Sequence, residues 1–378
     1  MSLAALRFGA PIAAVALALS GCAASTPENT DPTGTAGSIT VTASDTACEL
    51  SATTAKVGSV TFGIVNTGTK VNEFYIYEGE RIVSEVENIA PGLKRELKVD
   101  FTEPGTYTTA CKPGMTGDGI RADFTVTGSA ATGSADEKTT KAIADYQAFV
   151  AHEADELLEG TQAFVAAVKA GDVAKAKGLY ASAREPWEVI EPVAESFGDL
   201  DPKIDGREDV VAEGMKFTGY HRLEKDLWVS GLQKDSSAIA DQLLVDVTEV
   251  VKRSKEIKPT VLNIASGAKT LMDEIATSKI TGEEERYSHT DLADVKANLE
   301  GAQQALAALK PIIVERAPAL QTALDAKFTA ANALVDSHEV AGKLKLYTEL
   351  TDADIKALTV SLDALAEEVA KVPGVVEK

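Results

Sequence analysis

Beyond residue 37 the chain opens with short runs in which apolar and polar residues alternate. SITVTA, SVTFGIVN, KRELKVDF and GTYTTAC have the period of two that sends successive side chains to opposite faces of a strand. Turn sequences such as APG, EPG and KPGMTGDG separate these runs. Short strands with turns at this spacing predict a small antiparallel β-sandwich over residues 38–127.

From about residue 140 the apolar positions recur three and four residues apart, and this spacing predicts amphipathic helices. One helix is expected to end at Gly171, and Pro186 and Pro192 mark a kink or joint in the next. GDLDPKIDGRED is expected to be a polar loop. Further helices are predicted at 209–230, 236–258, 261–278, 290–308, 311–338 and 352–371. We therefore expect an all-α domain over residues 140–375, built as two antiparallel bundles packed together.

Two segments lack either periodicity. Residues 23–37 are rich in Pro, Gly, Ser and Thr, and residues 128–139 in Gly, Ser and Ala. Such compositions are typical of flexible chain, so the first is predicted to be a tether and the second a linker between the two domains.

The first 22 residues have the composition of a targeting segment. Arg7 precedes an apolar run over 8–19, which is too short to span a bilayer comfortably. The run ends in LSGC, which resembles a bacterial lipoprotein signal, and this implies acylation of Cys22. The alternative is an ordinary cleaved signal peptide with an incidental cysteine. We expect an extracytoplasmic protein of the cell envelope, anchored by lipid and not spanning the membrane.

The charge balance favours cationic ligands. Lys and Arg total 37 against 58 Asp and Glu, which gives a formal net charge of −21. This balance argues against nucleic acid as a partner and favours metal ions. Solubility is an alternative reason for acidity in a secreted protein.

The stretch GYHRLEKDLW contains a histidine and a carboxylate one helical turn apart. His221 and Glu224 are separated by three residues, so both project from one face of a helix that also carries Phe217 and Trp228. A buried carboxylate beside an imidazole is costly unless it is paired or bound to metal. The alternative is a core histidine satisfied by Glu224.

Acidic residues precede this stretch at helical spacing. Carboxylates together with one imidazole form an oxygen-rich ligand set that suits iron or manganese and is adequate for zinc. A solvated acidic face is the alternative, although Trp187, Val189 and Ile190 lie among the first three of these residues. The acidic residues are Glu185, Glu188 and Glu191, followed by Asp199, Asp201 and Asp205.

Three segments together resemble a known family. REPWEVIEPVAESFGDLDPKIDGRED, GYHRLEKDLW and KITGEEERYSHTDLADV are similar to the imelysin-type (peptidase M75) domain of EfeO-type iron-uptake lipoproteins, over about residues 140–375. The preceding β-domain with its two cysteines is similar to the cupredoxin-like domain of the longer EfeO form. The resemblance implies a cupredoxin-like sandwich followed by an imelysin-like helical domain.

The resemblance also implies a set of iron ligands in the helical domain. The HxxE pair falls on His221 and Glu224, and further acidic positions fall on Glu188, Glu191, Asp205 and Glu284. As alternatives to ligation around Glu284, TGEE and SHTD have the pattern of helix-capping boxes. We expect His289 to cap a helix or face solvent. We expect His152 and His338 to be surface or core residues.

The β-domain offers two cysteines and no histidine. The first histidine of the chain is His152, so a blue-copper centre with two histidine ligands cannot form within residues 38–127. An oxidising compartment favours a disulfide between Cys48 and Cys111. The resemblance instead implies Cys48, Glu73 and Cys111 as metal ligands, with copper as the candidate metal. Both alternatives stay open at this point.

The family implies that the protein captures iron, as Fe(II) or Fe(III), and passes it to an iron permease in the membrane within an EfeUOB-type system. It implies a secreted haem peroxidase as a second partner, and copper-assisted oxidation of Fe(II) as a further step. We expect binding and transport rather than catalysis.

Three other functions are weighed against this one. An imelysin-type metal-dependent peptidase is disfavoured, because HRLE supplies one histidine where HExxH zinc peptidases need two. A second alternative is a solute-binding lipoprotein for another metal or for a metal-bridged anionic polymer. The third is an interaction scaffold without metal chemistry.

Overall fold

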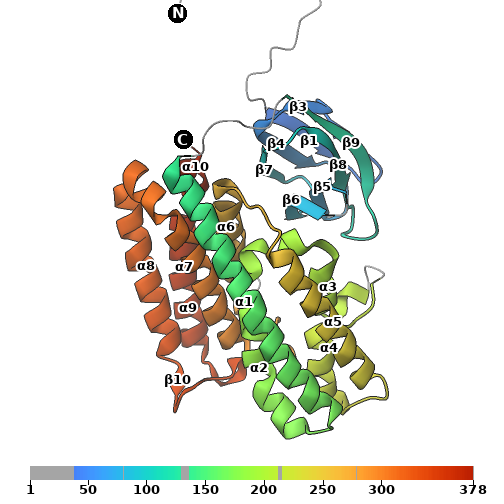
Figure 1. Ribbon diagram of the computed structural model, residues 1–378, viewed down its shortest axis with the longest axis vertical. Helices are drawn as coiled ribbons and strands as arrows, with labels where there is room; N and C mark the ends of the chain where they lie inside the picture. Colours follow the sequence, from blue (N-terminus) through green and yellow to red (C-terminus); the bar gives the residue numbers. More distant parts are fainter. Residues whose placement is uncertain (1–37, 80, 129–135, 212–214, 278, 378) are drawn as a thin grey trace, which may run out of the picture. The chain divides into compact units, whose positions relative to one another are not determined.

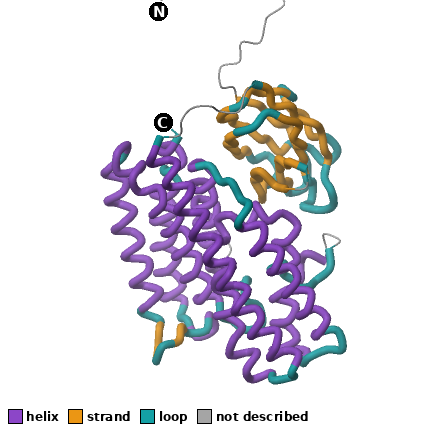
Figure 2. The backbone as a smooth tube through the Cα atoms, viewed as in Figure 1, coloured by secondary structure: helices purple, strands orange, loops and turns teal. Residues whose placement is uncertain are grey.

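The computed structural model describes residues 38–79, 81–128, 136–211, 215–277 and 279–377. Within this part the chain forms a β domain followed by a helical domain, and the latter carries one short hairpin of β10 (Glu339–Val340) and β11 (Lys343–Leu344) (Figure 2). The predicted order of a β domain and then an all-α domain is confirmed. The predicted signal peptide, the tether, Cys22 and most of the 128–139 linker lie outside the described residues.

The β domain is a sandwich of two mixed sheets, with strand orders β2-β1-β4-β7 and β3-β9-β8-β5-β6. Most neighbouring strands are antiparallel, as predicted, but β1 runs parallel to β4 and β3 runs parallel to β9. After β2 the chain visits the other sheet as β3 before it returns as β4, and this crossover replaces the reversal that a hairpin would give. The strands are β1 (Ser38–Ala43), β2 (Cys48–Leu50), β3 (Thr54–Lys56), β4 (Gly58–Asn66), β5 (Asn72–Glu78), β6 (Arg81–Ile89), β7 (Lys94–Phe101), β8 (Gly105–Cys111) and β9 (Ile120–Thr127).

Alternate side chains of both sheets fill the space between them. Phe62 is fully buried, and its ring centroid lies 5.5 Å from that of Phe74 and 5.4 Å from that of Phe124. These rings come from three strands in two sheets, so the period of two in the sequence translates directly into an aromatic core. Cys111 of β8 lies in the same core and is bridged to Cys48 of β2, which links the two sheets covalently.

The helices of the second domain share one continuous apolar core, as expected of bundles that pack together. α1 packs against α2, α5 and α7, while α7 also packs against α6 and α8, and α9 closes the group against α6 and α8 (Figure 1). The helices are α1 (Glu137–Lys169), α2 (Val173–Ile190), α3 (Asp201–Ile204), α4 (Gly219–Lys225), α5 (Ser236–Ser254), α6 (Val261–Thr277), α7 (Asp291–Arg316), α8 (Pro318–Asp336), α9 (Asp352–Val369) and α10 (Pro373–Val376).

None of the helices in the described ranges combines the length and the apolar composition that crossing a membrane requires.

Some of the prolines expected to interrupt a helix lie inside one instead. α2 continues through Pro186, and the joint falls at Pro192, in a 3₁₀ segment over Glu191–Leu200. The predicted break at residues 309–310 is wrong, because α7 runs through Pro311 to Arg316. Its buried apolar stripe continues past that proline, whereas Pro318 begins α8, where a missing N–H leaves no hydrogen bond unmade.

The segment around the HxxE motif is shorter and more irregular than a single helix over 209–230. It contains a 3₁₀ turn at Glu208–Val211, then α4, then a π-helical turn at Asp226–Ser230. The predicted polar loop before it includes the short helix α3. Short pieces of helix joined by turns allow residues from several directions to meet at one point, and the candidate site lies there.

Candidate metal centre

His221 is fixed by its neighbour one turn later in α4. His221 is 2% exposed and Glu224 is fully buried. Nδ1 of His221 lies 3.2 Å from Oε2 of Glu224. The other carboxylate oxygen of Glu224 accepts hydrogen bonds from the backbone N–H groups of Tyr287 and Ser288, at 2.9 and 2.6 Å. Because Nδ1 is engaged by Glu224, Nε2 is the ring nitrogen left to face Asp205 and Glu284.

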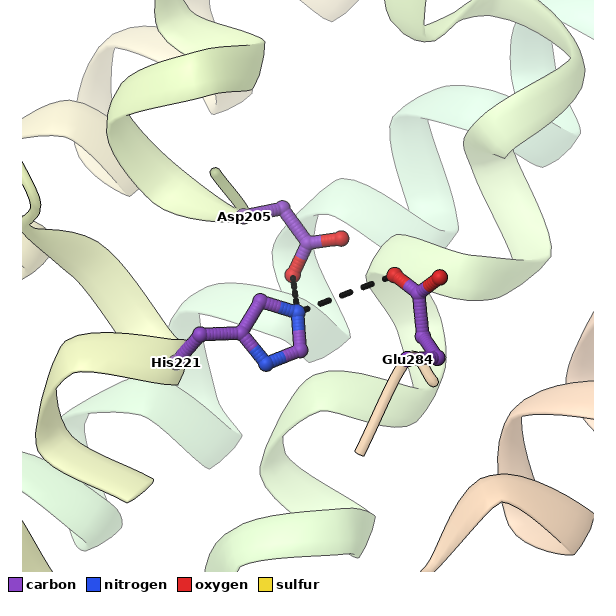
Figure 3. Close-up of side chains that lie close together, drawn as sticks. All are labelled: Asp205, His221 and Glu284. Atoms are coloured by element: carbon purple, nitrogen blue, oxygen red, sulfur yellow. Dashed lines mark ion pairs between the residues drawn. The ribbon is translucent and has the colours of Figure 1, made fainter. Parts of the chain in front are cut away.

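Two carboxylates from distant segments face Nε2 of His221 (Figure 3). Oδ1 of Asp205, at the end of α3, lies 3.5 Å from it, and Oε1 of Glu284, in the loop before α7, lies 3.7 Å from it. The side chains of Asp205 and Glu284 are 9% and 8% exposed. One ligand atom from each of the three residues lies within 4.8 Å of the other two, which is close enough for one metal ion. Glu224 and Glu285 form a second such grouping with the same imidazole.

Gly219 permits the close approach of α4 to the end of α3. Its φ is +76°, and a Cβ there would lie 2.1 Å from the carbonyl oxygen of Ile204. Asp205 follows Ile204 directly, and His221 lies two residues after Gly219. Glycine is therefore needed twice over, for the left-handed backbone and for the contact that brings Asp205 to His221.

The sequence interpretation missed Arg184, a fully buried guanidinium in the middle of this cluster. Burial disfavours its charged form, but the surrounding carboxylates outweigh this effect and hold the pKa of Arg184 well above its usual value. A sequence signal existed, since Tyr180, Arg184 and Trp187 lie on one buried stripe of α2. An arginine on an apolar stripe needs acidic partners. Its guanidinium nitrogens lie within 3.4 Å of carboxylate oxygens of Glu188, Asp205, Glu284, Glu285 and Asp294.

Glu188 and Glu191 are placed around a second missed cation, Lys279. The Lys279 ammonium is 5% exposed and lies 3.0 Å from Glu188 and 2.6 Å from Glu191. The side-chain amide of Asn298 donates to the same two carboxylates, at 2.9 and 2.6 Å. These two predicted ligands thus share one helix face, as expected, but they contact Lys279 rather than His221. Glu188 joins the His221 cluster indirectly, through Arg184 at 2.6 Å.

Carboxyl groups outnumber cations in this buried region, and the protonation of the region reflects the excess. Burial and Arg184 lower the pKa of His221, but Asp205, Glu224 and Glu284 raise it to about 10. Burial raises the pKa of Glu285 to about 8. A metal ion that binds in such a region displaces protons from the carboxyl and imidazole groups that become its ligands. The acidic groups are Glu188, Glu191, Asp205, Glu224, Glu284, Glu285 and Asp294, and they face Arg184, His221 and Lys279.

The segment over 281–291 contributes to this cluster, and SHTD does not form the capping box considered as an alternative. Thr290 is the N-cap residue of α7 and makes no side-chain capping hydrogen bond. Ser288 instead donates to Glu285 at 2.6 Å. In the described part of the chain, neither His152, His289 nor His338 belongs to a group that could hold a metal.

The three predicted β-domain ligands do not converge in the structure. Cys48 and Cys111 are joined in a disulfide, and a bridged cysteine has no thiolate to offer a metal. Cys111 pairs with Phe74 across β8 and β5 and projects into the sandwich. Glu73 precedes Phe74 on β5, so its side chain lies on the opposite face, where the hydroxyl of Tyr75 donates to it at 3.0 Å. In this arrangement the residues present do not fit a copper ion.

Comparison with known proteins identifies both domains. The imelysin family model matches residues 142–372, and a cupredoxin-like domain model matches residues 11–126. The chain is 40% identical over 341 residues to the "Iron uptake system component EfeO" of Escherichia coli O157:H7, covering 89% of this chain and 91% of that protein. It is 39% identical, with the same coverage, to the proteins of that name from Escherichia coli strain K12 and Shigella flexneri.

Replacing Gly219 by Ala is expected to separate Asp205 from His221. The clash with the Ile204 carbonyl and the positive φ should lower the free energy of unfolding by about 1–3 kcal/mol. Gly178→Ala is a matched control, since a Cβ at that exposed position of α2 meets nothing within 4 Å. It should be neutral or stabilising by up to about 1 kcal/mol. Urea unfolding of both variants measures this, and equal stability would contradict the role of Gly219.

Raising the pH is expected to weaken the metal-free protein through His221. Its pKa is raised from 6.5 to about 10, so its stabilising contribution is complete below pH about 6.5 and is lost as the pH rises through about 10. In urea unfolding at about pH 6 and about pH 9, His221→Asn should therefore lose less stability than the wild type. An equal loss in both proteins would show that His221 is not held protonated by its neighbours. The groups facing the imidazole are Tyr180, Arg184, Asp205, Glu224, Glu284 and Glu285.

Proposed function

The chain belongs to the imelysin family and, within it, to the EfeO-type iron-uptake components, and on this basis we propose that it binds iron through Asp205, His221 and Glu284. A role in iron uptake follows from the family. The observation that supports this particular site is the convergence of three ligand atoms within 4.8 Å, from residues far apart in the sequence. Buried carboxylates in excess over cations favour a multivalent ion as the missing positive charge.

The orientation of His221 supports a metal on Nε2. In metal sites a ligating histidine usually donates its second N–H to a carboxylate, which fixes the tautomer and makes the free nitrogen a better ligand. Glu224 takes this part, at 3.2 Å from Nδ1, and is itself held by two backbone N–H groups. Asp205 and Glu284 then supply hard oxygen ligands, which suit Fe(III) or Fe(II), with zinc as a substitute.

We propose that the iron is a cargo, captured in the cell envelope and handed to an iron permease in the membrane. A secreted haem peroxidase is the second proposed partner. Attachment to the membrane by lipid on Cys22 is part of the same proposal. The family supports the two partners, and the first 22 residues of the sequence support the lipid attachment.

The proposed capture of iron does not involve copper. Copper-assisted oxidation of Fe(II) would need thiolates that the Cys48–Cys111 disulfide removes, and Glu73 lies on the other face of its sheet. Iron capture by the helical domain does not depend on this step.

Proteolysis is the weaker alternative. Both candidate groupings in the described residues contain the same single imidazole. Zinc peptidases of the HExxH type hold their metal with two histidines, so neither grouping has their ligand set. A titration with several metal ions distinguishes binding of iron from binding of another metal and from the absence of metal binding.

Glu284→Gln and Glu283→Gln form a matched pair for testing the iron site. Glu284 faces Nε2 of His221, whereas the neighbouring Glu283 side chain is 49% exposed and lies 3.6 Å from Arg207. Losing a ligand should weaken iron affinity by at least about tenfold, since even supporting residues contribute about 10–100-fold. Glu283→Gln should stay within about twofold of the wild type.

The measurement is a titration of metal-free full-length protein with Fe(II) under anaerobic conditions and with Fe(III) against a competing chelator. Zn(II) and Cu(II) serve as comparison ions. Equal iron affinity of the two variants would remove Glu284 from the site. No iron binding by the wild type would overturn the proposed function.

A further inference from the structure

One nitrogen of Arg184 contacts all three proposed iron ligands. Nη2 lies 2.8 Å from Oδ2 of Asp205, 3.3 Å from Nε2 of His221 and 3.4 Å from Oε1 of Glu284. The same nitrogen also lies 2.6 Å from Oε1 of Glu188. A donor nitrogen that touches every member of the triad lies at or beside the position from which a metal ion would contact them.

An ion and this nitrogen cannot share that position. Metal–ligand bonds to imidazole nitrogen and carboxylate oxygen are about 2 Å long, so an ion bound to these atoms would approach Nη2 to within van der Waals contact. Two positive charges at such a distance repel strongly in a buried region. Binding of the ion therefore requires Nη2 to leave Asp205 and Glu284. It also requires Nε to give up its 2.6 Å contact with Oδ1 of Asp205, the oxygen that faces Nε2 of His221.

Whereas Nε and Nη2 of the guanidinium both contact the Asp205–His221–Glu284 triad, Nη1 has anchors that do not belong to it. Nη1 lies 2.8 Å from Oε1 of Glu285 and 2.8 Å from Oδ2 of Asp294. Asp294 is on α7 and is 2% exposed. Because Nη1 contacts Glu285 and Asp294, the Arg184 side chain can rotate away from the triad and its buried charge still has carboxylate partners.

We propose that Arg184 is a tethered counter-ion that competes with iron for Asp205 and Glu284 and sets the affinity of the site. This inference rests on the proposed function. Arg184 keeps the carboxylates together without metal, and iron binds only by replacing its contacts. The competition lowers iron affinity to a level that permits release to a partner. It also selects for multivalent ions, because a monovalent ion offers the carboxylates no more charge than the guanidinium it displaces.

Arg184→Gln tests this proposal against a role of Arg184 as fixed scaffold. If Arg184 competes with iron, its removal should tighten iron binding about tenfold or more, within the usual range of coupling between two ligands. Arg207→Gln is the matched control: Arg207 is 32% exposed and reaches one triad member, Glu284, at 3.3 Å. Its removal should change iron affinity by less than about threefold, because the charge is partly solvated.

Thermal unfolding gives an independent readout. Arg184→Gln should lower the melting temperature without metal, because buried carboxylates lose their partner. Iron should then raise the melting temperature more than it does in the wild type, as tighter binding requires. Because the single variant risks misfolding, Arg184→Gln/Asp294→Asn removes one buried charge of each sign and should show the same gain in affinity.

A measurement on the wild type needs no variant at all. Ga(III) is a diamagnetic ion of the same charge as Fe(III), and NMR of the Arg184 guanidinium should show a shifted Nε resonance and faster hydrogen exchange on Ga(III) binding. Wild-type iron binding combined with equal or weaker binding by folded Arg184→Gln would overturn this proposal alone. An unshifted Arg184 resonance at Ga(III) saturation would do the same. Absence of iron binding by the wild type would overturn the proposed function and this inference together.

Discussion

The helical domain holds an excess of buried carboxylates around one guanidinium. A carboxylate out of water is stable only beside a cation or dense hydrogen bonding. Arg184 supplies the cation for five such groups, and Lys279 supplies another for Glu188 and Glu191. The positive charge still falls short of the negative, and the surrounding carboxylates raise the pKa of His221 against the effects of burial and Arg184. A multivalent ion is the natural complement of this imbalance.

Long helices alone do not build such a site. α2 and α7 place Arg184 and Asp294, but Asp205, His221 and Glu284 come from short helices and turns between the long ones. Each of these short pieces is fixed by a specific local feature. Gly219 lets α4 touch the end of α3, and backbone N–H groups of Tyr287 and Ser288 hold Glu224. Rigid surroundings with irregular connections give a site in which residues distant in sequence meet within a few ångströms.

The periodicity of apolar residues predicts the two domains, because burial of apolar side chains determines both the sequence pattern and the fold. It fails at Pro311, where packing of α7 outweighs one lost hydrogen bond, and at 209–230, where residues 215–218 before α4 are not helical. In the site, the spacing of His221 and Glu224 predicts their shared face. The role of Arg184 is not predicted from the sequence, because most of the carboxylates that it contacts belong to other segments. Glu188 and Glu191 are placed on the right helix face, yet their partner is Lys279, a contact that no local pattern contains.

Anomalous scattering at the iron absorption edge, measured on crystals of the iron-loaded protein, tests whether Asp205, His221 and Glu284 hold the iron. We expect an iron peak about 2 Å from Nε2 of His221 and from a carboxylate oxygen of Asp205 and of Glu284, with Nη2 of Arg184 moved away from it. An iron peak confined to the acidic groove between α1 and α2, lined by Glu153, Glu156 and Glu185, with the His221 cluster unchanged, would contradict it.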